Sequence, residues 1–182
     1  MDELNEYWRL DGFGGGTNKM LKFYFSGDGR INRTKFALFG ALPILLLTQA
    51  LQIVVATIPH IKLPINASQQ PAMLLILLGV FAMSLCLAIT LYWALGCLTA
   101  KRAHDLNTTG RWGARIVIIG IAHLLTFCLL IFGLPTGGVS LLCFLGLLVI
   151  LATFIAVPGS KGCNKYGPPQ APSPKKHVKA FE

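Results

Sequence analysis

The residues of this chain that could do chemistry gather around one carboxylate. Between Asp28 and Glu182 the sequence contains a single acid, Asp105, which directly follows His104. An aspartate beside a histidine can orient the imidazole as a general base or as a ligand group. The structural alternative is that Asp105 forms an ion pair with one of three arginines, Arg30, Arg33 or Arg102. We favour this alternative, because loops between helices commonly use Asp, Asn and Thr as turn and cap residues.

Sequence patterns of the common enzyme classes are absent. Hydrolysis by paired carboxylates needs two acids around the scissile bond, and only Asp28 could join Asp105. The serine turn G-x-S-x-G, the metalloprotease motif H-E-x-x-H and the phosphate loop G-x-x-x-x-G-K-[ST] do not occur. The five cysteines form no C-x-x-C pair and have no histidine at ligand spacing. We therefore expect no enzymatic activity, no metal and no cofactor.

The composition indicates that a lipid bilayer surrounds the elements that position these residues. Hydrophobic residues make up 54% of the chain, charged residues only 13%, and the mean hydropathy is +0.63. A water-soluble fold could not bury that much apolar surface. We expect one membrane domain over residues 21–169, a flexible N-terminal tail over 1–20 and a disordered basic tail over 170–182.

Four uncharged stretches are long enough to cross a hydrocarbon core of about 30 Å. They predict transmembrane helices at roughly residues 36–58, 72–100, 116–132 and 139–157. The last two lie in one uncharged run, which must turn back at Leu134-Pro135-Thr136-Gly137-Gly138 because proline and paired glycines stop helices. Pro43 should kink the first helix. The fold class is therefore an all-α membrane protein, a bundle of four transmembrane helices.

The segment before the first span is short and amphipathic, Met20-Leu21-Lys22-Phe23-Tyr24-Phe25. It either lies on the membrane surface or serves as an ordinary aromatic anchor ahead of the span. Both interpretations remain open from the sequence.

The distribution of basic residues predicts the orientation in the membrane. Six precede the first span, four lie between the second and third, five follow the fourth, and only Lys62 falls on the opposite side. By the positive-inside rule both termini are cytoplasmic. The bases form no long basic helix and no stripe interleaved with aromatics, so we expect anionic lipid headgroups as the partner and no nucleic acid.

Three segments around the spans resemble the motifs of a known family. Residues 25–33 resemble F-x-G-R-x-x-R with an insertion, residues 101–112 resemble R-R-L-H-D-x-G-x-S-G-W-W, and residues 158–168 resemble P-G-x-x-G-x-N-x-Y-G-P. Their order and placement are similar to the bacterial inner-membrane family catalogued as domain of unknown function 805, over about residues 21–169. The resemblance implies a four-helix protein of the bacterial inner membrane, and it supplies no substrate or reaction.

The chain departs from the family pattern at several positions. Lys35 stands where the family usually has an acid after the second arginine, and Asn107 stands for a usual glycine. Lys101 and Arg111 replace the first arginine and the first tryptophan of the middle motif. An ion pair with the family's usual acid cannot form in this chain. Asp105 therefore becomes a more important candidate for an ion pair at this site.

Topology places all three motifs on the cytoplasmic side, where we predict one polar cluster of eight side chains: Arg30, Arg33, Arg102, His104, Asp105, Trp112, Asn164 and Tyr166.

The first functional hypothesis is a non-enzymatic scaffold whose cluster holds the bundle together and binds anionic lipid or a partner protein. The second is a small transporter, channel or export accessory, using uncharged polar residues of the spans: Thr48, Gln49, Gln52, Ser84 and Thr90. The third is a membrane-embedded enzyme that uses His104 with Asp105.

Two further features concern the interior of the spans. His123 is ionisable within the third span, and we favour a neutral imidazole hydrogen-bonded to a neighbouring helix over a functional group. Ser84 with Ala88, and Gly96 with Ala100, are small residues four apart that permit close helix approach. They predict packing within one chain or in a homo-oligomer, without deciding which.

Overall fold

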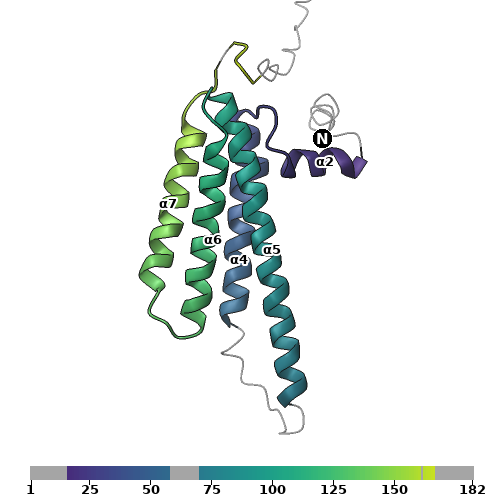
Figure 1. Ribbon diagram of the computed structural model, residues 1–182, viewed down its shortest axis with the longest axis vertical. Coiled ribbons are helices and arrows are strands. Elements are labelled where there is room, and N and C mark those ends of the chain that lie inside the picture. Colours follow the sequence, from purple (N-terminus) through teal and green to yellow (C-terminus); the bar gives the residue numbers. More distant parts are fainter. Residues whose placement is uncertain (1–15, 58–69, 161, 167–182) are drawn as a thin grey trace, which may run out of the picture.

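The computed structural model describes residues 16–57, 70–160 and 162–166, and every regular element within these ranges is helical. The elements in chain order are α2 (Gly16–Phe25), α3 (Arg33–Phe36), the π-helical turn η1 (Ala37–Ala41), α4 (Leu42–Thr57), α5 (Gln70–Asp105), α6 (Arg111–Ile131) and α7 (Gly137–Ala156). Helices α4 to α7 run side by side along the long axis, whereas α2 lies across the bundle near one end (Figure 1). Both predicted tails lie largely or wholly outside the described residues.

Four stretches are long and apolar enough to cross a membrane: Arg33–Thr57, Pro71–Asp105, Arg111–Ile131 and Gly137–Ala156. Large apolar side chains cover the outside of these helices, among them Leu46, Leu75, Met83 and Leu142, each at least 70% exposed. Exposing so continuous an apolar surface is unfavourable in water and favourable in hydrocarbon. The prediction of an all-helical protein with four helices of membrane-spanning length is confirmed.

Helix α5 continues beyond the range predicted for the second span and ends at Asp105. A Schellman motif stops it: the amide of Thr108 donates to the carbonyl of Ala103 at 2.9 Å, and that of Asn107 to the carbonyl of His104 at 3.1 Å. Asn107 has the left-handed φ of 58° that this motif requires. Asparagine is the residue other than glycine that best tolerates this conformation, which explains why it can replace the family's glycine.

The end of the bundle where α5 finishes and α6 begins is called the polar end below. Because α5 reaches Asp105, the side chains of Lys101, Arg102, His104 and Asp105 project from its last two turns instead of from a loop. Their relative directions are thus fixed by helical geometry.

Helix α2 is fastened to the bundle by hydrogen bonds to backbone carbonyls. Pro43 has no N–H to donate to the carbonyl of Phe39, and the chain forms the turn η1 just before the proline, where the sequence predicts a kink. The hydroxyl of Tyr24 donates to that carbonyl of Phe39 at 2.9 Å. Burial raises the pKa of Tyr24, so its hydroxyl remains protonated and can donate.

Lys101 holds the other side of α2. Its Nζ donates to the carbonyls of Lys22 at 3.1 Å and Phe23 at 2.7 Å, in the last turn of the helix, where the dipole is negative. Met20, Leu21 and Phe25 remain exposed. The segment is therefore part of a helix with exposed apolar side chains near one end of the bundle (Figure 1).

Glycines bring α5 and α6 into backbone contact. A Cβ on Gly113 would collide with the carbonyl oxygen of Gly96 and lie 3.0 Å from the Cβ of Ala100. A Cβ on Gly120 would collide with the ring of Tyr92, which is fully buried. The predicted small pair Gly96 and Ala100 therefore packs within the chain.

Candidate functional site: a buried ion-pair cluster at the polar end

Asp105 lies at the centre of the polar end and pairs with two arginines. Its Oδ1 accepts from Arg30 Nη2 at 2.9 Å and from Arg30 Nε at 3.1 Å, and its Oδ2 accepts from Arg102 Nη1. The side chains of Arg30 and Arg102 are 2% and 0% exposed, and that of Asp105 is 10% exposed. Both carboxylate oxygens are therefore engaged by guanidinium groups away from solvent. We call Arg30, Arg102, Asp105 and Ser160 the Asp105 cluster.

Arg102 ties the end of α5 to the end of α7. Its Nε donates to the carbonyl of Phe154 at 2.9 Å, and its Nη2 donates to the carbonyl of Val157. These carbonyls belong to the last turn of α7 and to its C-cap, where intrahelical partners run out and the helix dipole is negative. The guanidinium thus caps one helix while it pairs with a carboxylate on another.

Arg30 extends the cluster to the closing segment, residues 158–166. Its Nη1 donates to the carbonyl of Gly162 at 3.1 Å, and its Nη2 to the carbonyl of Ser160 at 2.8 Å. Ser160 returns two hydrogen bonds to the carbonyl of Asp105, from its amide and from its hydroxyl, both at 2.9 Å. Segments far apart in the sequence are thereby joined around one carboxylate.

Asn164, His104 and Tyr166 form an outer layer over this cluster. Asn164 Nδ2 donates to the carbonyl of His104 at 2.8 Å and to Ser160 Oγ at 3.1 Å, while its Oδ1 accepts from the amide of Tyr166 at 2.9 Å. The rings of His104 and Tyr166 stack with centroids 3.9 Å apart. His104 Nδ1 lies 3.2 Å from the carbonyl oxygen of Gly29.

Two motif glycines leave room for these charged groups. A Cβ on Gly159 would collide with Asp105 Oδ2, and a Cβ on Gly110 would lie 2.8 Å from His104 Nε2. Any larger residue would have to displace a buried carboxylate or the histidine ring. This accounts physically for the glycines of the second and third motifs.

The structure brings together six of the eight predicted cluster residues: Arg30, Arg102, His104, Asp105, Asn164 and Tyr166. Arg33 does not join them, because it begins α3 with an exposed side chain. Trp112 packs beside the cluster, its ring edge-on to Phe154 at 5.6 Å, and Arg115 lies over its face at 4.5 Å. Of the three arginines considered as partners for Asp105, the described contacts are with Arg30 and Arg102.

The geometry decides between the two interpretations of the His104–Asp105 pair. Both oxygens of Asp105 face arginines, and the histidine ring faces Gly29 and Tyr166, so the carboxylate does not orient the imidazole. Asp28 is exposed; its carboxylate accepts from the hydroxyl of Ser26 at 3.2 Å, and its own amide donates to that hydroxyl at 3.1 Å. Within the described ranges no three His, Cys, Asp or Glu side chains lie close enough to hold a metal. The arrangement can fix the segment around Arg30, the end of α5, and the end of α7 with its closing segment relative to one another.

Family comparison agrees with the motifs that build this site. The profile of a family described as protein of unknown function (DUF805) matches residues 24–168. This chain belongs to the DUF805 family. The matched range of the DUF805 chain holds every residue of the Asp105 cluster and all four long helices. No curated protein and no solved structure matches it.

Sequence reasoning missed three residues of the DUF805 site. Ser160 is an ordinary loop serine by sequence, and only the fold places it beneath Asp105. Lys101 is one of many bases in the sequence, and only the fold shows that it caps α2. Tyr24 compensates for Pro43, and the proline was a signal that some donor would be needed nearby.

His123 makes the hydrogen bond to a neighbouring helix that the favoured interpretation predicts. Its Nδ1 lies 3.0 Å from both the carbonyl oxygen and the hydroxyl of Ser140 on α7. The imidazole thus joins α6 to α7 inside the bundle.

Proposed function

We propose that this DUF805 protein is a non-enzymatic scaffold of the bacterial inner membrane, with both termini in the cytoplasm, whose polar end binds anionic lipid headgroups. The observation that carries the proposal is the saturation of the Asp105 cluster. Its charged groups are committed to one another and to backbone carbonyls, as expected of a structural clamp. A catalytic or transport site instead requires groups available to a substrate.

The lipid-binding groups in this proposal differ from those suggested by the motifs. Arg30 and Arg102 are turned inward, so their guanidinium forks are not offered to phosphate. Exposed cations at the same end include Lys22, Arg33, Arg111 and Arg115. We assign headgroup binding to these side chains, each of which attracts an anionic surface by about 1 kcal/mol.

A groove beside Arg115 supports the assignment. Leu106, Trp112 and Phe154 line it at the polar end, between the end of α5 and helices α6 and α7. The Arg115 guanidinium lies 4.5 Å above the Trp112 ring. An acyl chain in this groove would bring its phosphate within reach of the cation, and Trp and Arg are typical of the membrane–water interface. The exposed apolar residues of α2 would enter the same leaflet.

Transport receives less support from the geometry. The hydroxyls of Thr48, Ser84 and Thr90 each donate to a carbonyl of their own helix. Such bonds satisfy the hydroxyl locally and do not line a polar path.

The proposal is tested with the full chain in nanodiscs of phosphatidylethanolamine and phosphatidylglycerol. The triple variant Arg33→Gln, Arg111→Gln and Arg115→Gln should lower the ratio of retained phosphatidylglycerol to phosphatidylethanolamine, by up to about fivefold per cation removed. Mass spectrometry of lipid that survives brief detergent extraction gives the ratio. The matched control, Lys175→Gln with Lys176→Gln and Lys179→Gln, removes the same charge from the C-terminal tail. An unchanged ratio, or an equal fall in the control, contradicts a built headgroup site.

A further inference from the structure

Helix α5 is much longer than the helices beside it. It has 36 residues, whereas α6 has 21 and α7 has 20. These helices meet at the polar end, where Arg102 on α5 bonds to the carbonyl of Phe154 on α7. The extra length of α5 therefore lies at the opposite end of the bundle, where α5 continues past the other helices (Figure 1).

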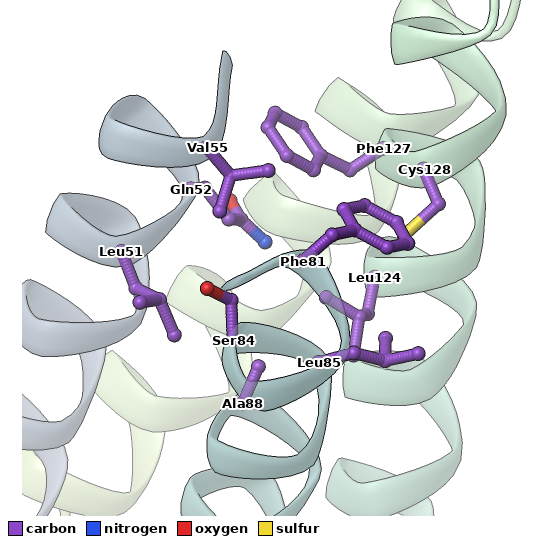
Figure 2. Close-up of a pocket in the computed structure, with 10 residues that line it drawn as sticks. All are labelled: Leu51, Gln52, Val55, Phe81, Ser84, Leu85, Ala88, Leu124, Phe127 and Cys128. Carbon is purple, nitrogen blue, oxygen red and sulfur yellow. The ribbon is translucent and has the colours of Figure 1, made fainter. Parts of the chain in front are cut away.

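Contacts of Phe81 mark the level at which the neighbouring helices end. Its ring centroid lies 6.1 Å from that of Phe132, the C-cap of α6. Phe81 also lines a small pocket together with Val55, which is close to the end of α4 (Figure 2). The part of α5 before Phe81, residues 71–80, thus extends beyond the ends of both helices by up to about 15 Å of helix rise. We call residues 71–80 the α5 overhang.

The α5 overhang is apolar and exposed around most of its circumference. Its large side chains include five that are 42–70% exposed: Leu74, Leu75, Ile76, Leu78 and Val80. At about 100° per residue, these side chains are spread over about two thirds of the helix circumference. A partner helix covers an apolar stripe of little more than about 100°, whereas acyl chains surround a helix. The exposure therefore fits lipid better than a protein partner.

The uncharged part of α5 is longer than the hydrocarbon core of a bilayer is thick. From Ala72 to Ala100 it rises by about 43 Å, against about 30 Å of hydrocarbon. Tilt alone would need about 45°, beyond the roughly 0–40° found for transmembrane helices. Helix α5 cannot tilt by itself, because it is in backbone contact with α6 at Gly96 and Gly113. Tilting the whole bundle would draw the beginning of α6, at Arg111, into hydrocarbon.

We infer that the α5 overhang selects phospholipids with long acyl chains and thickens the bilayer on its side of the bundle. The hydrocarbon boundary then lies near Pro71 beside α5, but near Phe132 beside α6 and α7. This keeps the apolar side chains out of water, and stretching the surrounding lipid costs little per ångström. The inference requires only that the long helices cross a bilayer, and it is independent of headgroup binding at the polar end.

Alkylation of introduced cysteines by a charged maleimide locates the boundary, because the reactive thiolate needs water. The full chain is used with its native cysteines replaced by alanine, one copy per nanodisc of dioleoylphosphatidylcholine. Leu75→Cys lies in the overhang, Leu134→Cys in the turn between α6 and α7, and Leu142→Cys on the outer face of α7. Leu75 and Leu142 are both 70% exposed, so they form a matched pair. Circular dichroism and gel filtration establish that each variant folds.

We expect Leu75→Cys to react as slowly as Leu142→Cys, and at least about tenfold more slowly than Leu134→Cys, as measured by intact-protein mass spectrometry. This order is expected although the overhang extends farther from the polar end than the turn does. Shorter dimyristoleoyl chains should quicken alkylation of Leu75→Cys, because hydrophobic mismatch grows. Longer dierucoyl chains should slow alkylation of Leu134→Cys, because the thicker core covers the turn.

A second readout measures the selection of chain length. In nanodiscs that mix dimyristoleoyl- and dierucoylphosphatidylcholine, lipid retained after brief detergent extraction should be enriched in the longer chain about threefold. Leu75→Lys with Leu78→Lys makes the overhang polar and should return the ratio to that of the bulk lipid. The control, Met20→Lys with Leu21→Lys on α2, adds the same charge near the polar end and should keep the enrichment.

Four results would overturn the inference. Alkylation of Leu75→Cys as rapid as that of Leu134→Cys would place the overhang in water. Protection that appears only with two copies per nanodisc would show that a second copy of the chain covers it. A helix tilt above about 40° in polarised infrared spectra would account for the length of α5 without thickening. Unchanged enrichment in the double lysine variant of α5 would show that the overhang does not select chain length.

Discussion

At the polar end, all three nitrogens of Arg102 and both carboxylate oxygens of Asp105 are hydrogen-bonded, whereas within the bundle several buried polar atoms are not. Among the described residues, those without a partner are Gln49 Nε2, Gln52 Nε2, Tyr92 Oη and His123 Nε2. The difference follows from the free-energy cost of burying each group without a hydrogen-bond partner or counter-charge. A buried charge cannot be left unpaired, while a neutral amide or hydroxyl can be stabilised by water that enters the bundle.

The two regions are also held together by different forces. The polar end is fixed by directed bonds between residues far apart in sequence, such as Arg30 to Asp105. The interior is fixed by close packing, where Gly96 and Gly113 bring two backbones together. Substitutions should therefore act through charge at one end and through volume in the middle.

The largest effect is expected from Asp105→Asn at the polar end. It removes the carboxylate charge between the buried side chains of Arg30 and Arg102, which should lower the free energy of unfolding by about 3–5 kcal/mol. Unfolding in mixed micelles by denaturing detergent measures it. Asp28→Asn, in an exposed turn, should stay within about 0.5 kcal/mol of wild type. Equal stability of the two variants would show that the cluster is not a clamp.

A smaller effect is expected from Gly113→Ala in the interior. The added methyl meets the backbone of Gly96, which cannot move aside like a flexible side chain, so we expect a loss of about 1–3 kcal/mol. Gly146→Ala on α7 meets nothing within 4 Å and should instead stabilise by about 0.5–1 kcal/mol. The same unfolding assay compares them. If both substitutions stabilise the protein, backbone contact between α5 and α6 does not limit its packing.

The smallest effect is expected from Tyr24→Phe, at the border between the polar end and the interior of the bundle. Loss of the bond to the Phe39 carbonyl should cost about 0.5–1.5 kcal/mol and loosen α2 selectively. Hydrogen exchange should quicken at the amides of α2 and remain unchanged in α6 and α7. Tyr166→Phe is the control, because its ring stack on His104 needs no hydroxyl. Protection of α2 that survives Tyr24→Phe would mean that Lys101 alone holds the helix.

Four long apolar helices, a reversal near Pro135 and an isolated carboxylate among arginines could all be predicted from the sequence. These follow from local composition and helix rise, which need no knowledge of neighbours. The end of α5 could not be predicted in this way. The uncharged stretch ends at Ala100, whereas the helix continues to Asp105 and is stopped by the left-handed turn at Asn107.

Arg102 lies three residues before Asp105 on the same helix, so local spacing already allows that pair. The assembled fold was needed to show that Arg30 meets Asp105, that Ser160 and Lys101 take part, and that Arg33 stands apart. Contacts between residues separated by 50 or more positions depend on how helix ends are placed relative to one another. That placement results from packing over the whole bundle, so no spacing within a motif encodes it. The unpaired amide of Gln52 is equally invisible in sequence, since a lack of partners is a property of the assembled fold.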